Sequence, residues 1–412
     1  MWRPETGERS RTCSRQSIMI YPLASGSNGM TEQFSKGLEG VVVAESELSD
    51  INGETGELVY RGYDIEDLAT GASYEEVLYL LWNGRLPARD ELAEFSNGMA
   101  GEFAVDEAVL DSLRVLADAD ERPMAALRTG VSMLSMTDPD ADARPRDEAA
   151  ARRKGRRILA QIPTLLAAYD RLRRGEEPVE PDESLSYAGN FLYMLTGDEP
   201  GEVAEETFDM ALSLHADHGL NASTFTTVVI ASTFADVYSS VTGGIGALAG
   251  PLHGGANQDV MEALFDLDER EITAREWVEE MVDRGSRVPG WGHRVYSVTD
   301  PRAAILRSKL EDLAAASGET KWLNYTTSIT EYLTEEQRLP EKGIAPNVDF
   351  YSGSVYHQLG IPVDMYTPIF AMARTGGWVA HILEYQTNNR LIRPRGRYVG
   401  PEDEAFVPLE NR

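Results

Sequence analysis

Cysteine is nearly missing from this sequence, because Cys13 is the only one among 412 residues. A single thiol excludes an intrachain disulfide and a thiolate metal cage, and it favours a reducing compartment. We therefore expect a cytoplasmic protein. Long uninterrupted apolar runs are missing too, since Asp236 and Pro251 interrupt the most apolar region, residues 224–252. This pattern predicts buried helix rather than a membrane span.

Lysine and positive charge are also scarce. The sequence has five lysines, and its 68 acidic residues outnumber the 38 lysines and arginines, which gives a formal net charge of -30. Such a surface repels nucleic acid and anionic membranes, so a general role on either is excluded. At high salt, screening removes the mutual repulsion of so many carboxylates. We therefore predict a halophilic protein.

Common nucleotide and metal motifs are absent as well. The sequence contains no P-loop, no dinucleotide-binding fingerprint and no metal signature. His215 and His218 stand in HADH, but they have neither a cysteine nor an HExxH-type acid with them, so we assign no metal site. The first 29 residues, rich in Arg and Ser, are expected to be a disordered tail, or an upstream extension of a protein whose natural start is Met30.

Helical patterns dominate the rest of the chain. Before them, β-prone runs at residues 41–43 and 58–60 flank Asn52-Gly53, a dipeptide typical of hairpin turns. Further on, one long helix is expected over residues 224–247. The sequence thus predicts a mainly α, many-helix protein with a minor β-hairpin near the N-terminus.

Three helix starts carry local signals. Asp300-Pro301 and Thr367-Pro368 each place a capping side chain before a proline at the first helical position. Asn257 follows a glycine-rich loop and is expected to cap a third helix. We expect helices to begin at these three points.

Two histidines lie in glycine-rich loops. His253 stands in GPLHGGANQ (250–258), and His293 stands in VPGWGHRVY (288–296). Glycine lets a ligand approach the main chain closely, and backbone groups in the second loop could bind a flat heteroaromatic ring. The alternatives are that His253 is an incidental loop residue and that His293 merely follows an inward-packed Trp291.

One carboxylate and two arginines have settings that stability alone explains poorly. Asp349 lies between Val348 and Phe350, and an apolar setting raises a carboxyl pKa towards that of a usable base. Capping of a helix is the alternative role. Arg302 opposes the helix dipole at the second helical position, where an anion would explain it. Arg374 lies on an apolar helix face, where burial requires a carboxylate or phosphate partner.

His218 follows a helix end and can point into a cleft, whereas His215, His357 and His381 are assigned structural roles. Taken together, the candidate groups suggest one chemistry. A base removes a proton next to a carbonyl, a histidine stabilises the enol oxygen, and arginines hold a dicarboxylate.

These residues fall in an ordered set of motifs that resembles citrate synthase, specifically the compact archaeal and Gram-positive type, and the acidic composition points to a haloarchaeal member. The resemblance runs from about Leu38 to the C-terminus. The motifs are YRGYDIEDLA (60–69), PMAALRTGVS (123–132), HADHGLNASTF (215–225), GPLHGGAN (250–257), PGWGHRVY (289–296), DPRA (300–303), PNVDFYSG (346–353), ARTGGWVAH (373–381) and NRLIRPR (389–395).

The resemblance implies a transferase of the tricarboxylic acid cycle that condenses acetyl-CoA with oxaloacetate and water to give citrate. The coenzyme A thioester is a co-substrate, and no tightly bound cofactor is expected. Asp349 would be the general base, His253 would bond the thioester oxygen, and His293 would polarise the ketone of oxaloacetate. The groups expected to bind substrates are His218, Arg302, Arg374 and the partner subunit's Arg393 for oxaloacetate, in a homodimer, and the backbone of Val288, Pro289, Gly290 and Trp291 for the CoA adenine.

The resemblance also implies two helical domains. Residues 30–252 and 350–412 would form the large domain, and residues 253–349 a small domain that closes over it. Within the family, 2-methylcitrate synthase, which uses propionyl-CoA, is an alternative, because one methylene contributes only about 1–3 kcal/mol of discrimination. A CoA-binding relative that has lost catalysis is the non-enzyme alternative.

Overall fold

A computed structural model describes residues 34–412 of the chain, which divides into two units, residues 1–45 and 46–412. In the first unit, the described residues 34–45 contain one short 3-10 turn, η1 (Lys36–Leu38). The tail predicted for residues 1–29, and Cys13 with it, lies outside the described residues.

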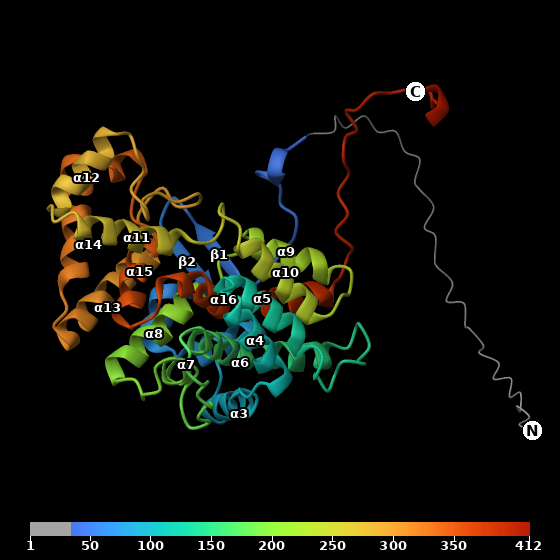
Figure 1. Ribbon diagram of the computed structural model, residues 1–412, viewed down its shortest axis with the longest axis horizontal. Helices are drawn as coiled ribbons and strands as arrows, with labels where there is room; N and C mark the ends of the chain where they lie inside the picture. The colour runs from blue at the N-terminus through green and yellow to red at the C-terminus, as the bar shows by residue number, and fades with distance from the viewer. Residues whose placement is uncertain (1–33) are drawn as a thin grey trace, which may run out of the picture. The chain divides into compact units, whose positions relative to one another are not determined.

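Helices make up most of the second unit, which confirms the mainly α prediction (Figure 1). None of those described combines the length and apolar character needed to span a bilayer. The α-helices are α1 (Ile65–Gly71), α2 (Tyr74–Asn83), α3 (Arg89–Ala100), α4 (Glu107–Asp118), α5 (Pro123–Leu134), α6 (Glu148–Arg173), α7 (Tyr187–Thr196), α8 (Glu202–His215), α9 (Ala222–Ala231), α10 (Val237–Leu248), α11 (Ala256–Glu269), α12 (Ala274–Asp283), α13 (Pro301–Ser317), α14 (Lys321–Glu331), α15 (Val348–Gln358) and α16 (Tyr366–Thr387). Shorter turns are the π-helical η2 (Tyr332–Glu336) and the 3-10 turns η3 (Pro340–Lys342), η4 (Val363–Met365) and η5 (Leu409–Asn411).

A three-stranded antiparallel sheet precedes the helices, in the order β1 (Ser49–Asn52), β2 (Glu57–Tyr60) and β3 (Tyr63–Asp64). The turn predicted at Asn52-Gly53 is confirmed, since Asn52 pairs with Glu57 across it. The first strand was predicted at residues 41–43, and that prediction is wrong. These residues are too far from the turn to pair across it, and Val42 is 88% exposed.

One of the three predicted helix starts is confirmed. The Asp300 carboxylate accepts the N–H of Arg302, and Pro301 is the first residue of α13. The start predicted at Thr367-Pro368 is wrong, because η4 delivers the chain to Tyr366 already in a helical conformation.

The start predicted for the helix after the glycine-rich loop is also wrong. Gly255 takes a left-handed conformation with φ of 97° at the N-cap, so α11 begins at Ala256 and Asn257 lies inside the helix. The loop's own backbone geometry, rather than a capping side chain, therefore begins α11.

The single helix predicted over residues 224–247 is two helices, α9 and α10. Phe234 takes φ of 59° between them, and the Asp236 carboxylate then caps α10 by accepting the N–H of Ser239. A capping side chain thus outweighed a continuous apolar pattern. The two helices pack closely because Gly243 has no side chain, and a Cβ there would lie 2.2 Å from Cδ1 of Ile230.

Helix α16 lies at the centre of the fold (Figure 1). It packs against α2, α5, α6, α8, α9 and α10 and is buried over most of its length. Missing side chains allow two of these contacts. A Cβ on Gly376 would lie 2.1 Å from Cδ2 of Leu78, and one on Gly377 would lie 2.2 Å from the carbonyl oxygen of Ala216.

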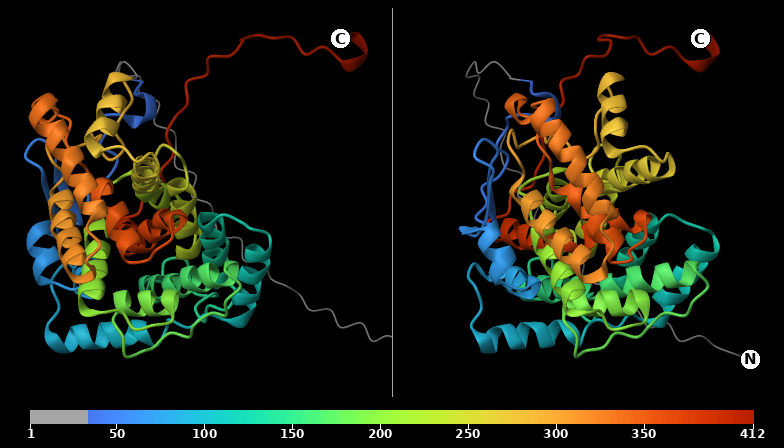
Figure 2. Two further views of the ribbon diagram at one scale, coloured as in Figure 1. Left: turned by 60° about the vertical axis from the view of Figure 1, so that its left-hand side comes forward. Right: turned by 90° about the vertical axis from the view of Figure 1, so that its left-hand side faces the viewer.

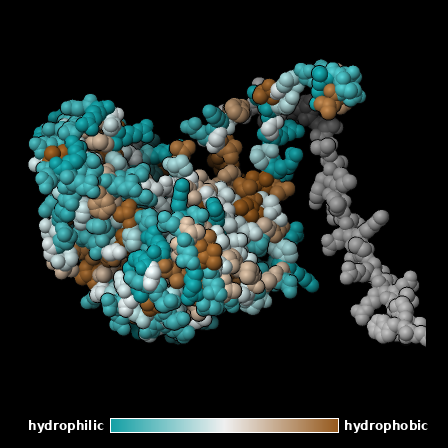
Figure 3. Space-filling model, in the orientation of Figure 1, coloured by the Kyte–Doolittle hydropathy of each residue, from teal (hydrophilic) through white to brown (hydrophobic). Residues whose placement is uncertain are grey.

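Helices α11–α14 gather on one side of the second unit, away from α3–α7 (Figures 1 and 2). Among them, α13 packs against both α15 and α8. The surface over α12 and α14 is mostly hydrophilic (Figure 3), in keeping with the excess of acidic residues. The boundaries expected for a large and a small domain remain a prediction.

Candidate active site

His253 lies in the loop between α10 and α11. Its Nε2 accepts the backbone N–H of Ser223 at 3.1 Å and lies 2.8 Å from the Ser223 hydroxyl oxygen. Because Nε2 is an acceptor, the ring proton of the neutral form is on Nδ1. Burial, with a further contribution from the charge of Arg374, lowers the pKa of His253 to about 4. The ring is therefore neutral near pH 7 and offers an N–H to a ligand.

His293 is held in the opposite tautomer. Its Nδ1 accepts the backbone N–H groups of Val295 at 3.0 Å and Tyr296 at 3.2 Å, so the ring proton is on Nε2. Burial lowers the pKa of His293 to about 4, and the positive charge of Arg302 adds to this effect. A neutral ring with a fixed Nε2–H is suited to polarise a carbonyl oxygen.

His218 lies beyond the end of α8 and beside His293. The two ring centroids are 5.6 Å apart, and His218 Nε2 is 3.2 Å from the hydroxyl oxygen of Tyr296. Burial keeps the pKa of His218 well below its ordinary value, and the charges of Arg302 and Arg374 lower it further. Within residues 34–412, no group of His, Cys, Asp and Glu side chains is arranged to hold a metal ion.

Asp349 is the second residue of α15. The N-cap of this helix is Asn347, whose side-chain oxygen accepts the Asp349 N–H at 2.9 Å. Asp349 therefore does not cap the helix, and that alternative is wrong. Its carboxylate accepts no hydrogen bond within the described residues. Burial raises the pKa of Asp349 to about 6, although the charge of Arg302 partly opposes this shift. A carboxylate in this state is ionised near pH 7 and more basic than a solvated one.

Arg302 has an acidic partner within the fold, Asp300, and its contact with a bound anion stays a prediction. Its Nε lies 3.0 Å from Oδ1 of Asp300 and its Nη2 lies 2.7 Å from Oδ2. Both side chains are buried. Burial opposes the charge of Arg302, but the Asp300 carboxylate raises the pKa of the guanidinium above its ordinary value. A bidentate pair of this kind fixes the orientation of the guanidinium.

Arg374 is buried, as predicted, and its binding of an anion stays a prediction. It is 2% exposed, its Nε donates to the carbonyl oxygen of His215 at 2.6 Å, and its guanidinium carbon is 4.7 Å from the centre of the Phe370 ring. It forms no ion pair with any residue that the structure describes. Burial lowers the pKa of Arg374 to about 10, and the charge of Asp217 partly offsets this shift.

The turn at residues 288–291 lies directly against the start of α15. Trp291 forms a β-bridge with Pro346, and the Gly290 carbonyl accepts the Asn347 N–H at 2.9 Å. Gly290 takes φ of 76°, and a Cβ there would lie 2.7 Å from Cβ of Phe350. The predicted adenine-binding turn is thus joined through backbone contacts to the segment that carries the candidate base.

Arg393 is not brought to the other candidates. It lies in the extended segment after α16, is exposed, and forms no hydrogen bond or ion pair within the described residues. The start of that segment is anchored to the end of α9, because the Asn389 side chain donates to the Ser232 carbonyl at 3.0 Å.

Several contributing residues were not predicted from the sequence. Ser223, Tyr296 and Asp300 contact predicted site residues. For Asp300 a signal existed, since the cap of a helix lies next to the side chain of the second helical residue. Ser223 is 30 positions from His253, and no local pattern connects them.

A family model described as "Citrate synthase, C-terminal domain" matches residues 37–395. The chain is 57% identical over 384 residues to a citrate synthase of Haloferax volcanii, covering 93% of this chain and 100% of that one. It is 41% identical to 2-methylcitrate synthase 1 of Corynebacterium glutamicum, covering 92% of this chain and 99% of that one.

Solved structures of citrate synthases are also similar to this chain. Citrate synthase from Pyrobaculum aerophilum superposes with a TM-score of 0.85 at 40% identity, covering 91% of this chain and 94% of that one. A ternary complex of carboxymethyl coenzyme A and oxaloacetate with citrate synthase from Thermoplasma acidophilum superposes with a TM-score of 0.84 at 32% identity, covering 92% and 100%.

The family model and the similar proteins show an enzyme of the transferase class, in a family that uses a coenzyme A thioester as a substrate. More specifically, the chain belongs to the citrate synthase family, whose members make citrate from acetyl-CoA and oxaloacetate.

Proposed function

We propose that this chain carries out the citrate synthase reaction with Asp349, His253 and His293 as its catalytic residues. The observation that carries the proposal is the complementary protonation of these groups. Asp349 is a basic acceptor, whereas the two neutral histidines keep their protons on opposite ring nitrogens, Nδ1 in His253 and Nε2 in His293.

In the proposed reaction, the Asp349 carboxylate takes a proton from the methyl group of acetyl-CoA. The His253 Nδ1–H donates to the thioester oxygen and stabilises the enol that forms. The enol carbon attacks the ketone carbon of oxaloacetate, and the His293 Nε2–H gives its proton to the ketone oxygen. Water then hydrolyses the citryl thioester, which releases citrate and free CoA, and proton exchange with solvent returns Asp349 to its carboxylate and His293 to its neutral form.

We assign oxaloacetate binding to His218, Arg302, Arg374 and Arg393 of the partner subunit. The first three lie close enough for their charges to shift each other's pKa values. Arg393 requires a homodimer, in which the extended segment after α16 reaches the neighbouring site. Exposed apolar side chains support a dimer: Leu252, in the loop after α10, is 97% exposed, and Leu391, in the segment after α16, is 56% exposed.

We assign the CoA adenine to the backbone of Val288, Pro289, Gly290 and Trp291. The Gly290 N–H and the Pro289 carbonyl make no hydrogen bond within the described residues. Gly290 is buried and Pro289 is partly exposed, so the Pro289 carbonyl is the more accessible of the two groups to a heterocycle. Residues 253–349 would form the small domain, which closes over the large one when CoA binds. His253 and Asp349 would then lie at the two crossings between the domains.

The same residues could act on propionyl-CoA, as the name of the Corynebacterium glutamicum relative, 2-methylcitrate synthase 1, suggests. We favour acetyl-CoA because the more similar Haloferax volcanii relative is a citrate synthase. The test is free-thiol release with oxaloacetate and each thioester. A higher kcat/KM for acetyl-CoA supports the proposal, a higher value for propionyl-CoA supports 2-methylcitrate synthase, and no release with either contradicts both.

We further propose that the protein works in a salt-rich cytoplasm, within the tricarboxylic acid cycle. The net charge of -30 supports this, because the self-repulsion of the folded state falls when salt screens it. Unfolding measured across a salt series is the test. The free energy of unfolding should rise with salt concentration, and full stability in dilute buffer would contradict the proposal.

A further inference from the structure

Three positions on one face of α16 contact residues 215, 216 and 217 in turn. Arg374 and His381 are seven positions apart, which places them on the same side of a helix, and Gly377 lies between them. Arg374 bonds the carbonyl oxygen of the first of the three residues. Gly377 packs on the carbonyl oxygen of the second, and His381 Nε2 lies 3.1 Å from Oδ1 of the third, Asp217. The next residue along the chain is His218.

Asp217 is fully buried, and both of its carboxylate oxygens have partners. Besides the contact with His381, Oδ2 accepts the Ser49 hydroxyl at 2.5 Å and the Gly219 N–H at 3.2 Å. Burial would raise the pKa of Asp217, but His381 and the charge of Arg374 bring it below its ordinary value, so the carboxylate is ionised. A buried carboxylate with so many donors holds its surroundings in one arrangement.

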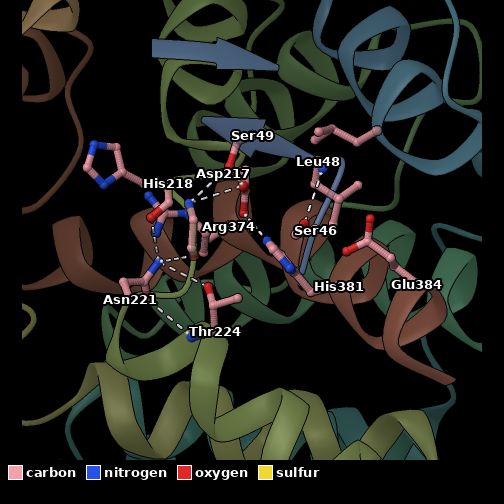
Figure 4. Close-up of polar contacts among 12 residues, drawn as sticks. Ser46, Leu48, Ser49, Asp217, His218, Asn221, Thr224, Arg374, His381 and Glu384 are labelled. Atoms are coloured by element: carbon pink, nitrogen blue, oxygen red, sulfur yellow. Dashed lines mark hydrogen bonds and ion pairs between the residues drawn. The ribbon is translucent and has the colours of Figure 1, made fainter. Parts of the chain in front are cut away.

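Asp217 also provides the first favourable charge for Arg374. Burial destabilises the charged guanidinium, and among the groups that oppose this effect Asp217 contributes most. The two side chains are adjacent where the loop after α8 meets α16 (Figure 4). Asp217 thus stabilises the positive charge of Arg374 without forming an ion pair that a substrate carboxylate would have to displace.

We propose that Asp217, held in place by His381, is a positioning residue for oxaloacetate binding. Its carboxylate keeps Arg374 charged and oriented, and its backbone fixes the direction of His218. The His381 side chain, assigned to structure from the sequence alone, therefore acts through Asp217. This inference rests on the proposed assignment of Arg374 and His218 to oxaloacetate.

The test compares Asp217→Asn with Asp170→Asn in the full-length protein. Asp170 is a suitable control because it is also buried and paired with arginines, Arg173 and Arg174, but belongs to α6. Asp217→Asn should raise the KM for oxaloacetate by roughly 10- to 100-fold, the range seen for groups that orient metal ligands, and leave the KM for acetyl-CoA within about twofold. Asp170→Asn should alter only thermal stability.

A second pair of variants keeps the proposal testable if Asp217→Asn does not fold. His381→Gln retains an N–H donor towards Asp217 and should keep a near-normal KM for oxaloacetate, whereas His381→Leu should raise it. Calorimetric titration with oxaloacetate alone should give the same order of affinities. Equal effects of both His381 variants, or an unchanged oxaloacetate KM in folded Asp217→Asn, would overturn the positioning role. Absence of thiol release by the unmodified enzyme would instead refute the proposed function.

Discussion

The two buried arginines carry the same charge in opposite surroundings. Arg302 is bidentate to Asp300, and this carboxylate raises the pKa of the guanidinium. Arg374 has a backbone carbonyl and an aromatic ring as its close partners, and burial lowers its pKa to about 10. One arginine is therefore compensated before any substrate arrives. The other is held in place with its charge incompletely compensated, which favours binding of an anion.

This difference separates two requirements of an anion site. A compensated arginine is stable in the absence of substrate, but its partner competes for its N–H groups. An uncompensated arginine binds an anion more strongly, but the folded state must tolerate the buried charge. The family's dicarboxylate substrate would meet one arginine of each kind, and mutations can separate the two contributions.

The largest effect is expected from substitution of the proposed base, Asp349, whose pKa the charges of Arg302 and Arg374 both lower. Asp349→Asn should lower kcat by about 100- to 10,000-fold with little change in the KM for oxaloacetate, because it removes the proton acceptor but neither guanidinium. Steady-state thiol release measures both parameters. Since burial raises the pKa of Asp349, its ionised form is unfavourable in the folded state above pH 6, so the variant should be no less stable. Normal turnover would show that the base has been assigned wrongly.

The second largest effect should be a loss of protein stability in Arg302→Ala, which would distinguish Arg302 from Arg374. Arg302→Ala leaves the Asp300 carboxylate buried and unpaired, and removal of one member of a buried pair costs about 3–5 kcal/mol of the free energy of unfolding. Chemical denaturation measures the loss. The double variant Asp300→Asn/Arg302→Gln should recover part of it. An Arg302→Ala protein as stable as the original would mean that the pair contributes nothing to folding.

Arg374 should show the reverse pattern, a smaller effect that appears in binding. Arg374→Ala removes a charged hydrogen-bond donor worth about 1.5–3 kcal/mol, so the KM for oxaloacetate should rise by roughly 10- to 150-fold. Stability should fall less than in Arg302→Ala, because no carboxylate is left unpaired at bonding distance. Parallel denaturation and kinetics on the two variants test the contrast. Equal stability losses would remove the distinction between the two arginines.

The smallest effect should be the pH dependence. Because burial raises the pKa of Asp349 to about 6, its proton-accepting form is lost as pH falls, and kcat/KM for acetyl-CoA at pH 5 should be about one tenth of its plateau value. His253 and His293, with pKa values of about 4, stay neutral down to pH 5, so they add no second titration to the pH–rate profile. Arg374→Gln should move the acidic fall in kcat/KM to higher pH, because the Arg374 charge lowers the pKa of Asp349. A flat profile down to pH 5 would contradict the assignment.

Local patterns predicted the helical class and the hairpin turn because both depend on neighbouring residues. The motif set located the candidate residues but not their partners. Asp300 was read as a helix cap, and the capping geometry is present, yet the same carboxylate also pairs with Arg302. The break between α9 and α10 was missed because one capping aspartate, Asp236, outweighs an apolar run.

Long-range contacts explain the other omissions. Ser223 orients His253, and Ser49 bonds Asp217 across 168 positions of sequence. Pairings of this kind arise only when distant segments pack, so no spacing in the chain encodes them. The role proposed for Arg393 would depend on a second copy of the chain, so no contact within one folded chain can reveal it.

The central position of α16 has a consequence for the order of folding. This helix is the last of the α-helices, yet the Tyr74 hydroxyl bonds the Ala373 carbonyl across 299 positions, and Arg374 bonds His215 across 159. During synthesis from the N-terminus, helices α2, α5, α6, α8, α9 and α10 must therefore wait for their common partner until nearly the whole chain has been made. Contacts over such separations also form slowly, because loop closure precedes them. The core and the groups proposed to bind oxaloacetate would then be completed in one late event, so a nascent chain would gain its substrate affinity only when it gains its stability.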